Sequence, residues 1–257
     1  MLSFHFPHSA CHGTNQSSTE ATGRYHGNGQ ALNDHDGVIP GEWHGDKQEH
    51  EWFRKLVSTP EFADRADDVV MEFGNSLYQK ISRSLHRWRG CPSGTGAESL
   101  AQYRGRDRAP SPVYGLLYQT VRKTNQKRRG KRQIRILCGD PYIDWEKVKD
   151  REDVGPYLGN CDQWYAQVVK NEVLAKKHHA LLIAGGGHCL RWNGPGYIEL
   201  RAAGAQTFFV VFGTNAVGDY DDLDKRFESW PMPAIVSLPN NWVGDLPEPG
   251  RNRRWCQ

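Results

Sequence analysis

Acidic and imidazole side chains crowd one short stretch in the first fifth of the chain. The segment EWHGDKQEH, residues 42–50, carries Glu42, His44 and His50 with two further carboxylates before the sequence turns apolar. Groups of these types suit general acid–base catalysis, binding of a divalent metal, or ligation of a haem iron. The stretch therefore predicts one wall of an active site, with a charged loop leading into a surface helix as the simpler alternative.

Three more groups of the same chemical kind follow apolar runs later in the chain. Glu72 closes the run DDVVMEF, Asp140 closes QIRILCGD, and His188 follows the run HALLIA after three glycines. Apolar runs separated by helical patterns predict an α/β fold, with a mostly parallel central sheet flanked by helices. Ligands bind outside the carboxyl ends of such strands. We therefore expect Glu42, Glu72, Asp140 and His188 to meet at one edge of the sheet.

The apolar pattern also gives the expected bounds of the main elements. Strands are expected at residues 38–39, 67–73, 133–140, 179–188, 207–213 and 234–238. Pro40 is expected to close the first strand. Asp46 and Glu49 have the spacing of a capping box at the start of the next helix, and residues 162–177 predict a long amphipathic helix.

Three consecutive glycines precede His188. Gly185, Gly186 and Gly187 are expected to let the backbone turn sharply and approach a ligand closely. Neither GxGxxG nor GxxxxGK[ST] is present at this strand end, so a phosphate cradle is not expected. Gly186 joins His50 and Asp140 as a candidate for cofactor binding.

Four motifs in order resemble a known superfamily. GEWHG followed by His50, then VVMEFGN, then GD after a strand, then LLIAGGGH, are similar to motifs of ChaN-like haem-binding proteins, Tiki-type metalloproteases and erythromycin-esterase-like hydrolases. The ChaN-like branch, with motifs resembling GExHDxxxHH and AGxGH, is the most similar. The resemblance covers residues 38 to about 245.

The resemblance implies an α/β core with a polar pocket at the strand ends. It places Glu42, His44, Glu72 and His188 at the functional positions of the superfamily. The chain departs from the pattern beside the first two of these. Only Trp43 separates Glu42 from His44 where the esterase branch has two residues, and a glycine follows His44 where the ChaN-like pattern has Asp.

Three chemistries are open to these four residues. His44 or His188 could act as general base on a water molecule, with Glu72 as acid or orienting group, in metal-free hydrolysis. Glu42, His44, Glu72 and His188 could instead bind a divalent metal that keeps an open position for water. A His or Tyr could also ligate haem in an apolar aromatic pocket.

Hydrolysis of an ester or peptide-like substrate, with metal assistance left open, is the expected function. The alternative is a non-catalytic haem- or cofactor-binding protein of the ChaN-like type. Three of these residues also have a structural explanation, since Glu42 could cap the next helix, His50 could lie on the surface, and Asp140 could belong to a turn before Pro141. His188 after three glycines is the hardest to explain as structure.

Composition limits the classes of partner. The 257 residues are 37% hydrophobic and 25% charged with a net charge of +3, which is typical of a globular protein and too small for a general nucleic-acid surface. Residues 123–135 carry seven basic residues without interleaved aromatics, so a solvated loop is expected there. A small-molecule substrate or cofactor is the expected partner. No apolar run has the length of a membrane span, and the oligomeric state stays open.

The first 36 residues differ in composition from the rest. They are rich in Gly, Ser, Asn, Thr and His with little apolar periodicity, which predicts a disordered tail before a single α/β domain at residues 37–257. No signal peptide is recognised, and the six cysteines are scattered without a CxxC pair. A cytoplasmic location is the default expectation.

Overall fold

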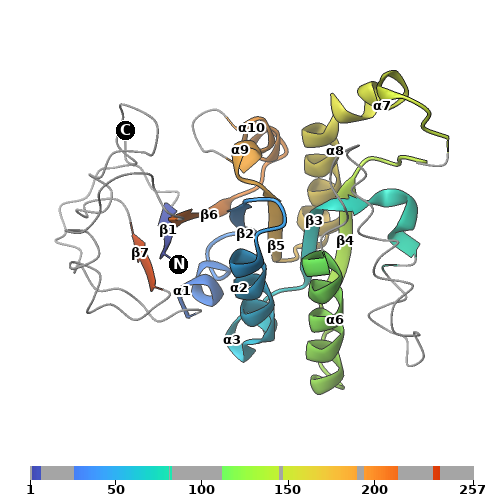
Figure 1. Ribbon diagram of the computed structural model, residues 1–257. Helices are drawn as coiled ribbons and strands as arrows, with labels where there is room; N and C mark the ends of the chain where they lie inside the picture. The colour runs from blue at the N-terminus through green and yellow to red at the C-terminus, as the bar shows by residue number, and fades with distance from the viewer. Residues whose placement is uncertain are drawn as a thin grey trace.

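The computed structural model describes residues 2–6, 26–80, 82, 112–144, 147–189, 194–213 and 234–237. Figure 1 shows a twisted sheet with helices on both faces. Its seven strands have the order β4-β3-β5-β2-β6-β1-β7. The strands are β1 (Leu2–Phe6), β2 (Gly37–Glu42), β3 (Asp68–Asn75), β4 (Arg135–Asp140), β5 (Ala180–Gly185), β6 (Thr207–Gly213) and β7 (Ala234–Ser237).

Five neighbouring strands, β4, β3, β5, β2 and β6, run parallel. Nearly all residues of β4, β3, β5 and β2 are buried, which explains the continuous apolar runs in β3, β4 and β5. The expected α/β fold with a mostly parallel sheet and flanking helices is confirmed. β1 departs from this pattern, because it pairs antiparallel with β6 and parallel with β7.

Two described elements lie within the first 36 residues. β1 lies inside the sheet between β6 and β7, and helix α1 (His26–Ala31) is followed by the fully buried Leu32. The low apolar content of the segment hides these pieces, because each one is only five or six residues long.

Each face of the sheet has its own helices and its own hydrophobic core. Helices α2 (Lys47–Ser58), α3 (Pro60–Ala63) and α6 (Pro112–Lys127) cover one face, where Phe53, Leu117 and Ile183 pack together. Helices α8 (Cys161–Val168) and α10 (Pro195–Ala202) cover the other, around Leu137 and Leu182. The remaining described helices are short: the 3₁₀ turn η1 (Ser76–Tyr78), α7 (Arg151–Leu158) and α9 (Gly186–Cys189).

Three expectations about element bounds are wrong. The strand expected at residues 179–188 ends at Gly185, because α9 begins at Gly186. Pro40 does not close the first strand, because β2 continues to Glu42. Its pairing with β6 extends to Pro40, and its pairing with β5 skips Ile39 and Pro40 and resumes at Gly41. The predicted helix 162–177 is divided into α8, the π-helical turn η2 (Val169–Val173) and the 3₁₀ turn η3 (Leu174–Lys176).

An ion network lies at the end of the sheet where the parallel strands begin. Arg135 donates to both carboxylate oxygens of the buried Asp68, at 2.6 and 2.8 Å, and lies 3.1 Å from Glu172. His178 Nδ1 lies 3.0 Å from the second oxygen of Asp68. The side chain of Asp68 is fully buried, so this network supplies the partners that a buried carboxylate requires.

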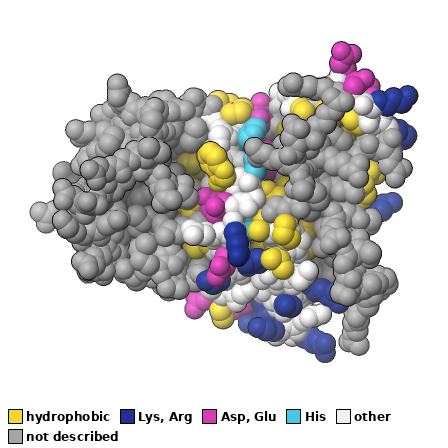
Figure 2. Space-filling view, viewed as in Figure 1, with side chains coloured by type: hydrophobic (Ala, Val, Ile, Leu, Met, Phe, Trp, Pro, Cys, Tyr) yellow, Lys and Arg dark blue, Asp and Glu magenta, His cyan; other side chains and the backbone are white. Residues whose placement is uncertain are grey.

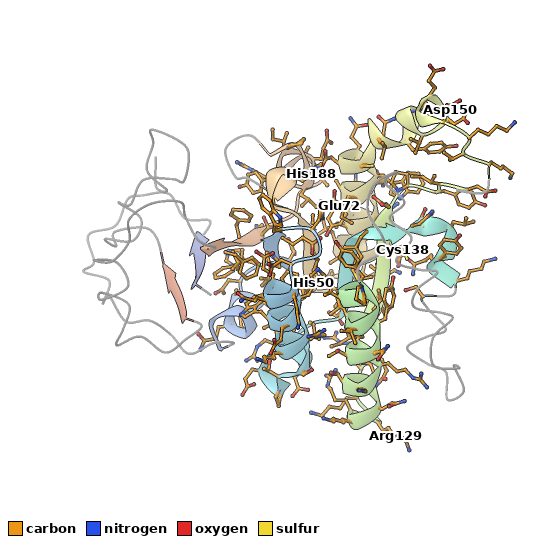
Figure 3. The ribbon with its side chains drawn as sticks, in the orientation of Figure 1. His50, Glu72, Arg129, Cys138, Asp150 and His188 are labelled. Carbon is orange, nitrogen blue, oxygen red and sulfur yellow. The ribbon has the colours of Figure 1, made fainter. Side chains whose placement is uncertain are left out.

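The basic stretch at residues 123–135 lies at this same end of the molecule. Figure 2 shows Lys and Arg side chains gathered along the lower part of the visible face, and Figure 3 places Arg129 far from His188. Arg128 and Lys131 both contact Asp64, and Arg132 contacts Asp67. Much of this positive charge is therefore already paired within the chain.

The helices in the described part of the chain are too short or too polar to cross a membrane.

Candidate functional site

The parallel strands deliver the predicted groups to one edge of the sheet. Glu42 is the last residue of β2, Glu72 lies near the end of β3, and Asp140 is the last residue of β4. His188 lies in α9, which begins directly after β5. Figure 3 shows Glu72 and His188 close to one another, with His50 of α2 further inside.

Glu42 holds two imidazoles with one carboxylate. Its Oε1 lies 2.8 Å from His44 Nδ1 and its Oε2 lies 2.6 Å from His50 Nε2. The side chains of Glu42 and His50 are fully buried, whereas that of His44 is 33% exposed. Only His44 of these three therefore reaches the solvent side of the site. His50 is not the surface residue of the simpler interpretation.

The charge of this trio follows from the same contacts. Burial would by itself raise the pKa of Glu42, but the hydrogen bonds of His44 and His50 outweigh it and hold the pKa below the usual value. The carboxylate is therefore ionised, and the facing nitrogens of both imidazoles must be donors. The hydrogen bond to Glu42 raises the pKa of His44 above its usual value of 6.5. His44 thus carries its proton on Nδ1, and Nε2 is the basic nitrogen.

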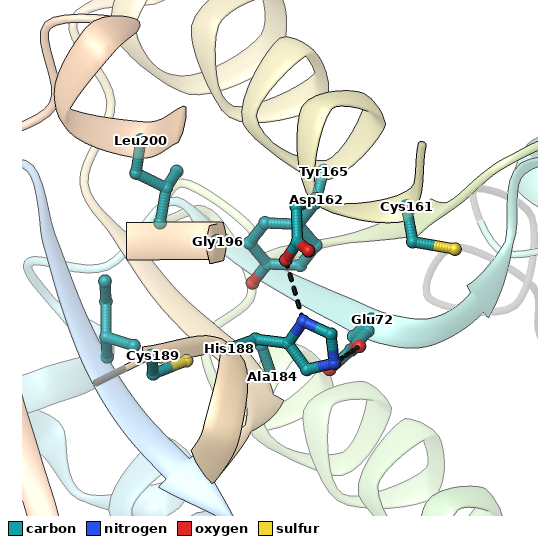
Figure 4. A pocket seen from close by; sticks show the side chains of 10 residues that line it. Glu72, Cys161, Asp162, Tyr165, Ala184, His188, Cys189, Gly196 and Leu200 are labelled. Atoms are coloured by element: carbon teal, nitrogen blue, oxygen red, sulfur yellow. Dashed lines mark hydrogen bonds and ion pairs between the residues drawn. The ribbon is translucent and has the colours of Figure 1, made fainter. Parts of the chain in front are cut away.

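His188 forms a second imidazole–carboxylate pair on the other face of the sheet. Its Nδ1 lies 2.8 Å from Asp162 Oδ1, and its Nε2 lies 3.4 Å from Glu72 Oε1 (Figure 4). The hydrogen bond to Asp162 is the main cause that raises the pKa of His188 to about 9, and the charge of Glu72 adds to it. The imidazole is therefore a cation at neutral pH, and it is 38% exposed.

The two pairs meet at Gly185, the last residue of β5. A Cβ atom placed on Gly185 would lie 2.8 Å from His44 Nε2 and 3.3 Å from His188 Cδ2. The backbone N–H of Gly185 donates to Glu72 Oε2 at 2.5 Å, which fixes that carboxylate beside His188. His44 Nε2 and the His188 ring thus both lie close to Gly185, where a side chain would clash with His44.

The glycines serve the site in a way the sequence did not predict. Among the described glycines only Gly45, Gly130 and Gly204 have positive φ, so Gly185–Gly187 do not form a left-handed turn. They run from β5 straight into α9. Gly186 lies against Gly41, where an added Cβ on Gly41 would come within 2.9 Å of the Gly186 Cα. The missing side chains therefore make room for close packing and for the histidines.

Two further carboxyls near the site hold protons more strongly than usual. Burial, then the charge of Glu72, raises the pKa of Asp140 well above its usual range. Burial raises the pKa of Glu49 to about 8, against the opposing effect of its hydrogen bond from the Trp43 N–H at 2.6 Å. The predicted capping box is half present, since Asp46 accepts from the Glu49 N–H but Glu49 reaches Trp43 instead of Asp46.

Asp162 is the residue that sequence reasoning missed. It lies in the first turn of α8, where an acidic residue is ordinary because it complements the helix dipole. Its contact with His188 spans 26 residues and crosses between two helices. No local spacing in the sequence signals this pair.

The pocket in Figure 4 lies on the α8 and α10 side of the sheet. Its walls combine apolar groups with the second imidazole pair, and the cavity volume of about 10 Å³ is close to that of a single water site. The lining residues are Ile39, Glu72, Cys161, Asp162, Tyr165, Ala184, His188, Cys189, Gly196 and Leu200. Burial raises the pKa of Cys161 to about 12, so this thiol does not supply a thiolate.

The expected metal set does not fit a metal ion as the residues are arranged. In the described part of the chain, no group of three or more His, Cys, Asp or Glu residues is placed to hold one. Both oxygens of Glu42 face imidazole nitrogens, and both oxygens of Glu72 face Gly185 and His188. The oxygens of Glu42 therefore bind His44 and His50, and those of Glu72 face Gly185 and His188, rather than a common metal centre.

The comparisons with known proteins identify the fold and no more. No protein-family model and no curated protein matches the chain. Among solved structures, the type III effector HopBA1 matches with a TM-score of 0.50 at 12% identity, over 87% of this chain and 98% of HopBA1. The haem-binding ChaN of Campylobacter jejuni matches with a TM-score of 0.38 at 11% identity, over 72% of this chain and 91% of ChaN.

The likeness to HopBA1 shows a common fold. The ChaN match falls below the TM-score at which a likeness carries an argument. Membership of the ChaN-like, Tiki or erythromycin-esterase-like groups therefore stays a prediction.

Proposed function

We propose that the protein is a hydrolase of ester or peptide-like substrates that activates water with a pair of histidines. The observation that carries the proposal is the meeting of His44 Nε2 and the His188 ring above Gly185, each imidazole held through Nδ1 by a carboxylate. This arrangement supplies an oriented base and an oriented acid on either side of Gly185.

The two histidines take different roles because their carboxylate partners differ in burial. The side chain of Glu42 is fully buried, whereas that of Asp162 is partly exposed. His44 takes a proton from water through Nε2, while the buried Glu42 stabilises the imidazolium that forms. The water oxygen attacks the carbonyl carbon of the substrate. His188, already a cation at neutral pH, donates its proton to the leaving oxygen or nitrogen, and the products are a carboxylic acid and an alcohol or amine.

Glu72 acts as the orienting group of this reaction. Its two oxygens bind the Gly185 N–H and lie beside His188 Nε2, so it ties the strand end to the acid. Asp162 holds the other nitrogen of the same ring. Ile39 and Leu200 form an apolar part of the pocket wall beside this pair.

The proposal is tested by hydrolysis assays on the full-length protein. Nitrophenyl esters of several acyl lengths and aminoacyl anilides serve as probes, with and without a chelator. His44→Gln and His188→Gln are expected to lower kcat by about 10²-fold or more. His179→Gln is the matched control, because His179 precedes the opposite end of β5. Unchanged turnover in both site variants would overturn the proposal.

The alternative is a non-catalytic haem- or cofactor-binding protein that uses the same pocket. A haem titration of the same samples separates the two functions. A Soret band that is lost in His188→Gln, with no hydrolysis of any probe, would favour the alternative.

A further inference from the structure

His50 is buried beside the proposed base but takes no part in the reaction described above. Its side chain is fully buried in α2, and Nε2 lies 2.6 Å from Glu42 Oε2. The other oxygen of that carboxylate holds His44. His50 therefore acts on His44 only through Glu42.

The surroundings of His50 decide its protonation. Its ring lies edge-on to Phe53 and Tyr114, with centroids 5.1 and 4.8 Å apart, and is tilted 5.8 Å from Phe73. Nδ1 is buried and has no hydrogen-bond partner. A proton on Nδ1 would be a buried donor without an acceptor among aromatic rings, which is costly. The ionised Glu42 requires the proton on Nε2, so His50 is a neutral Nε2–H tautomer.

A second donor is what a buried catalytic carboxylate needs. The terminal torsion of a glutamate has broad, nearly two-fold preferences, so one hydrogen bond does not fix the carboxylate plane. With His50 on one oxygen and His44 on the other, both oxygens of Glu42 are held and its charge is compensated by two N–H donors. The aromatic rings around His50 hold the donor itself in place.

We propose that His50 is a positioning residue: as a neutral Nε2–H donor in an aromatic cage it fixes the Glu42 carboxylate, which in turn holds His44 over Gly185. Its effect on turnover rests on the proposed hydrolase function. Its effect on the Glu42–His44 pair does not.

The experiment compares two substitutions of similar size in the full-length protein. His50→Gln keeps a side-chain N–H that reaches about as far as the imidazole Nε2, whereas His50→Leu removes the donor. Imidazole ¹⁵N spectra report the tautomers of His50 and His44, and kcat and KM are measured with the ester probes. In the native protein we expect His50 as Nε2–H and His44 with its Nδ1–H bonded to a carboxylate.

His50→Leu is expected to lower kcat by about 10- to 100-fold with a smaller change in KM, and to weaken the His44 Nδ1–H signature. His50→Gln is expected to restore most of both. A cationic or Nδ1–H His50 in the native protein would overturn the proposal without any variant. So would a His44 signature that is the same in His50→Leu and the native protein.

The two proposals fail in different ways. If no probe is hydrolysed, the hydrolase function fails, while the ¹⁵N spectra still decide whether His50 orders the Glu42–His44 pair. If His50→Leu does not fold, the native tautomer and the His50→Gln spectra carry the decision.

Discussion

His44 and His188 have the same arrangement. Each ring is bonded to a carboxylate through Nδ1, is partly exposed, and lies beside Gly185. They differ in what surrounds the carboxylate, because Glu42 is fully buried and Asp162 is not. At the scale of single residues, the proposed division into base and acid follows from these partners.

The pH dependence of hydrolysis tests this division. The base His44 must be neutral, so kcat/KM falls on the acid side at its pKa, which lies above 6.5. The acid His188 must be protonated, so kcat/KM falls on the alkaline side at about 9. Asp162→Asn removes the main cause of the raised pKa of His188, and we expect the alkaline limb to move to lower pH. Profiles from about pH 5 to about pH 10 measure both limbs; an unmoved limb would assign it to another group.

Gly185 gives a second prediction at this scale. Gly185→Ala places a methyl group against His44 Nε2, so the base is displaced and kcat is expected to fall by about 10²-fold. Gly187→Ala is the matched control, because an added Cβ there meets nothing within 4 Å. Circular dichroism checks that both variants fold. Equal activity in the two variants would contradict the meeting of the histidines above Gly185.

At the scale of elements, the first and last residues of β3 and β4 have different surroundings. Their final residues, Asn75 and Asp140, lie at the edge with the candidate site, while Asp68 and Arg135 begin the same strands in the ion network. The strands are thus anchored at one end and chemically active, as proposed, at the other.

This separation predicts a stability effect without a direct effect on chemistry. Arg135→Met leaves the buried Asp68 without its two strongest hydrogen bonds, and we expect a loss of about 3 kcal/mol in the free energy of unfolding. Lys131→Met, which removes an exposed contact with Asp64, is expected to change stability little. Urea unfolding followed by circular dichroism measures both. Similar losses in the two variants would show that the Asp68 network contributes no more to the free energy of unfolding than an exposed ion pair.

At the scale of the whole molecule, the sheet extends beyond its parallel part. β1, from the extreme N-terminus, lies between β6 and β7, and α1 contacts α3 and precedes the buried Leu32. The division into a tail at residues 1–36 and a single domain at residues 37–257 stays a prediction.

Two shortened chains test the boundary. A chain that starts at Gly37 loses β1, α1 and Leu32, and we expect its free energy of unfolding to fall by about 2 kcal/mol or more, because Leu32 is 1% exposed. A chain that starts at His26 keeps α1 and Leu32 and is expected to be the more stable of the two. Thermal and urea unfolding compare them with the full chain. Equal stability of all three would support the disordered tail.

The sequence by itself determined the sheet and the chemical types at its edge. Continuous apolar runs separated by helical patterns are enough to indicate buried parallel strands, and Glu42, Glu72, Asp140 and His188 close those runs or follow them within a few residues. Their common location then follows from the geometry of parallel strands. Pro40 and the π-helical turn escaped prediction because pairing with neighbouring strands and packing override local propensity.

Only the tertiary structure decided which groups pair with which. Asp162 reaches His188 from another helix, His50 is buried behind Glu42, and Gly185 is the point where two histidines from opposite faces meet. These relations join residues that are separated in sequence over distances of 2.6 to 3.3 Å. The spacing of residues along the sequence carries no such information, because these contacts depend on how the helices pack against the two faces of the sheet.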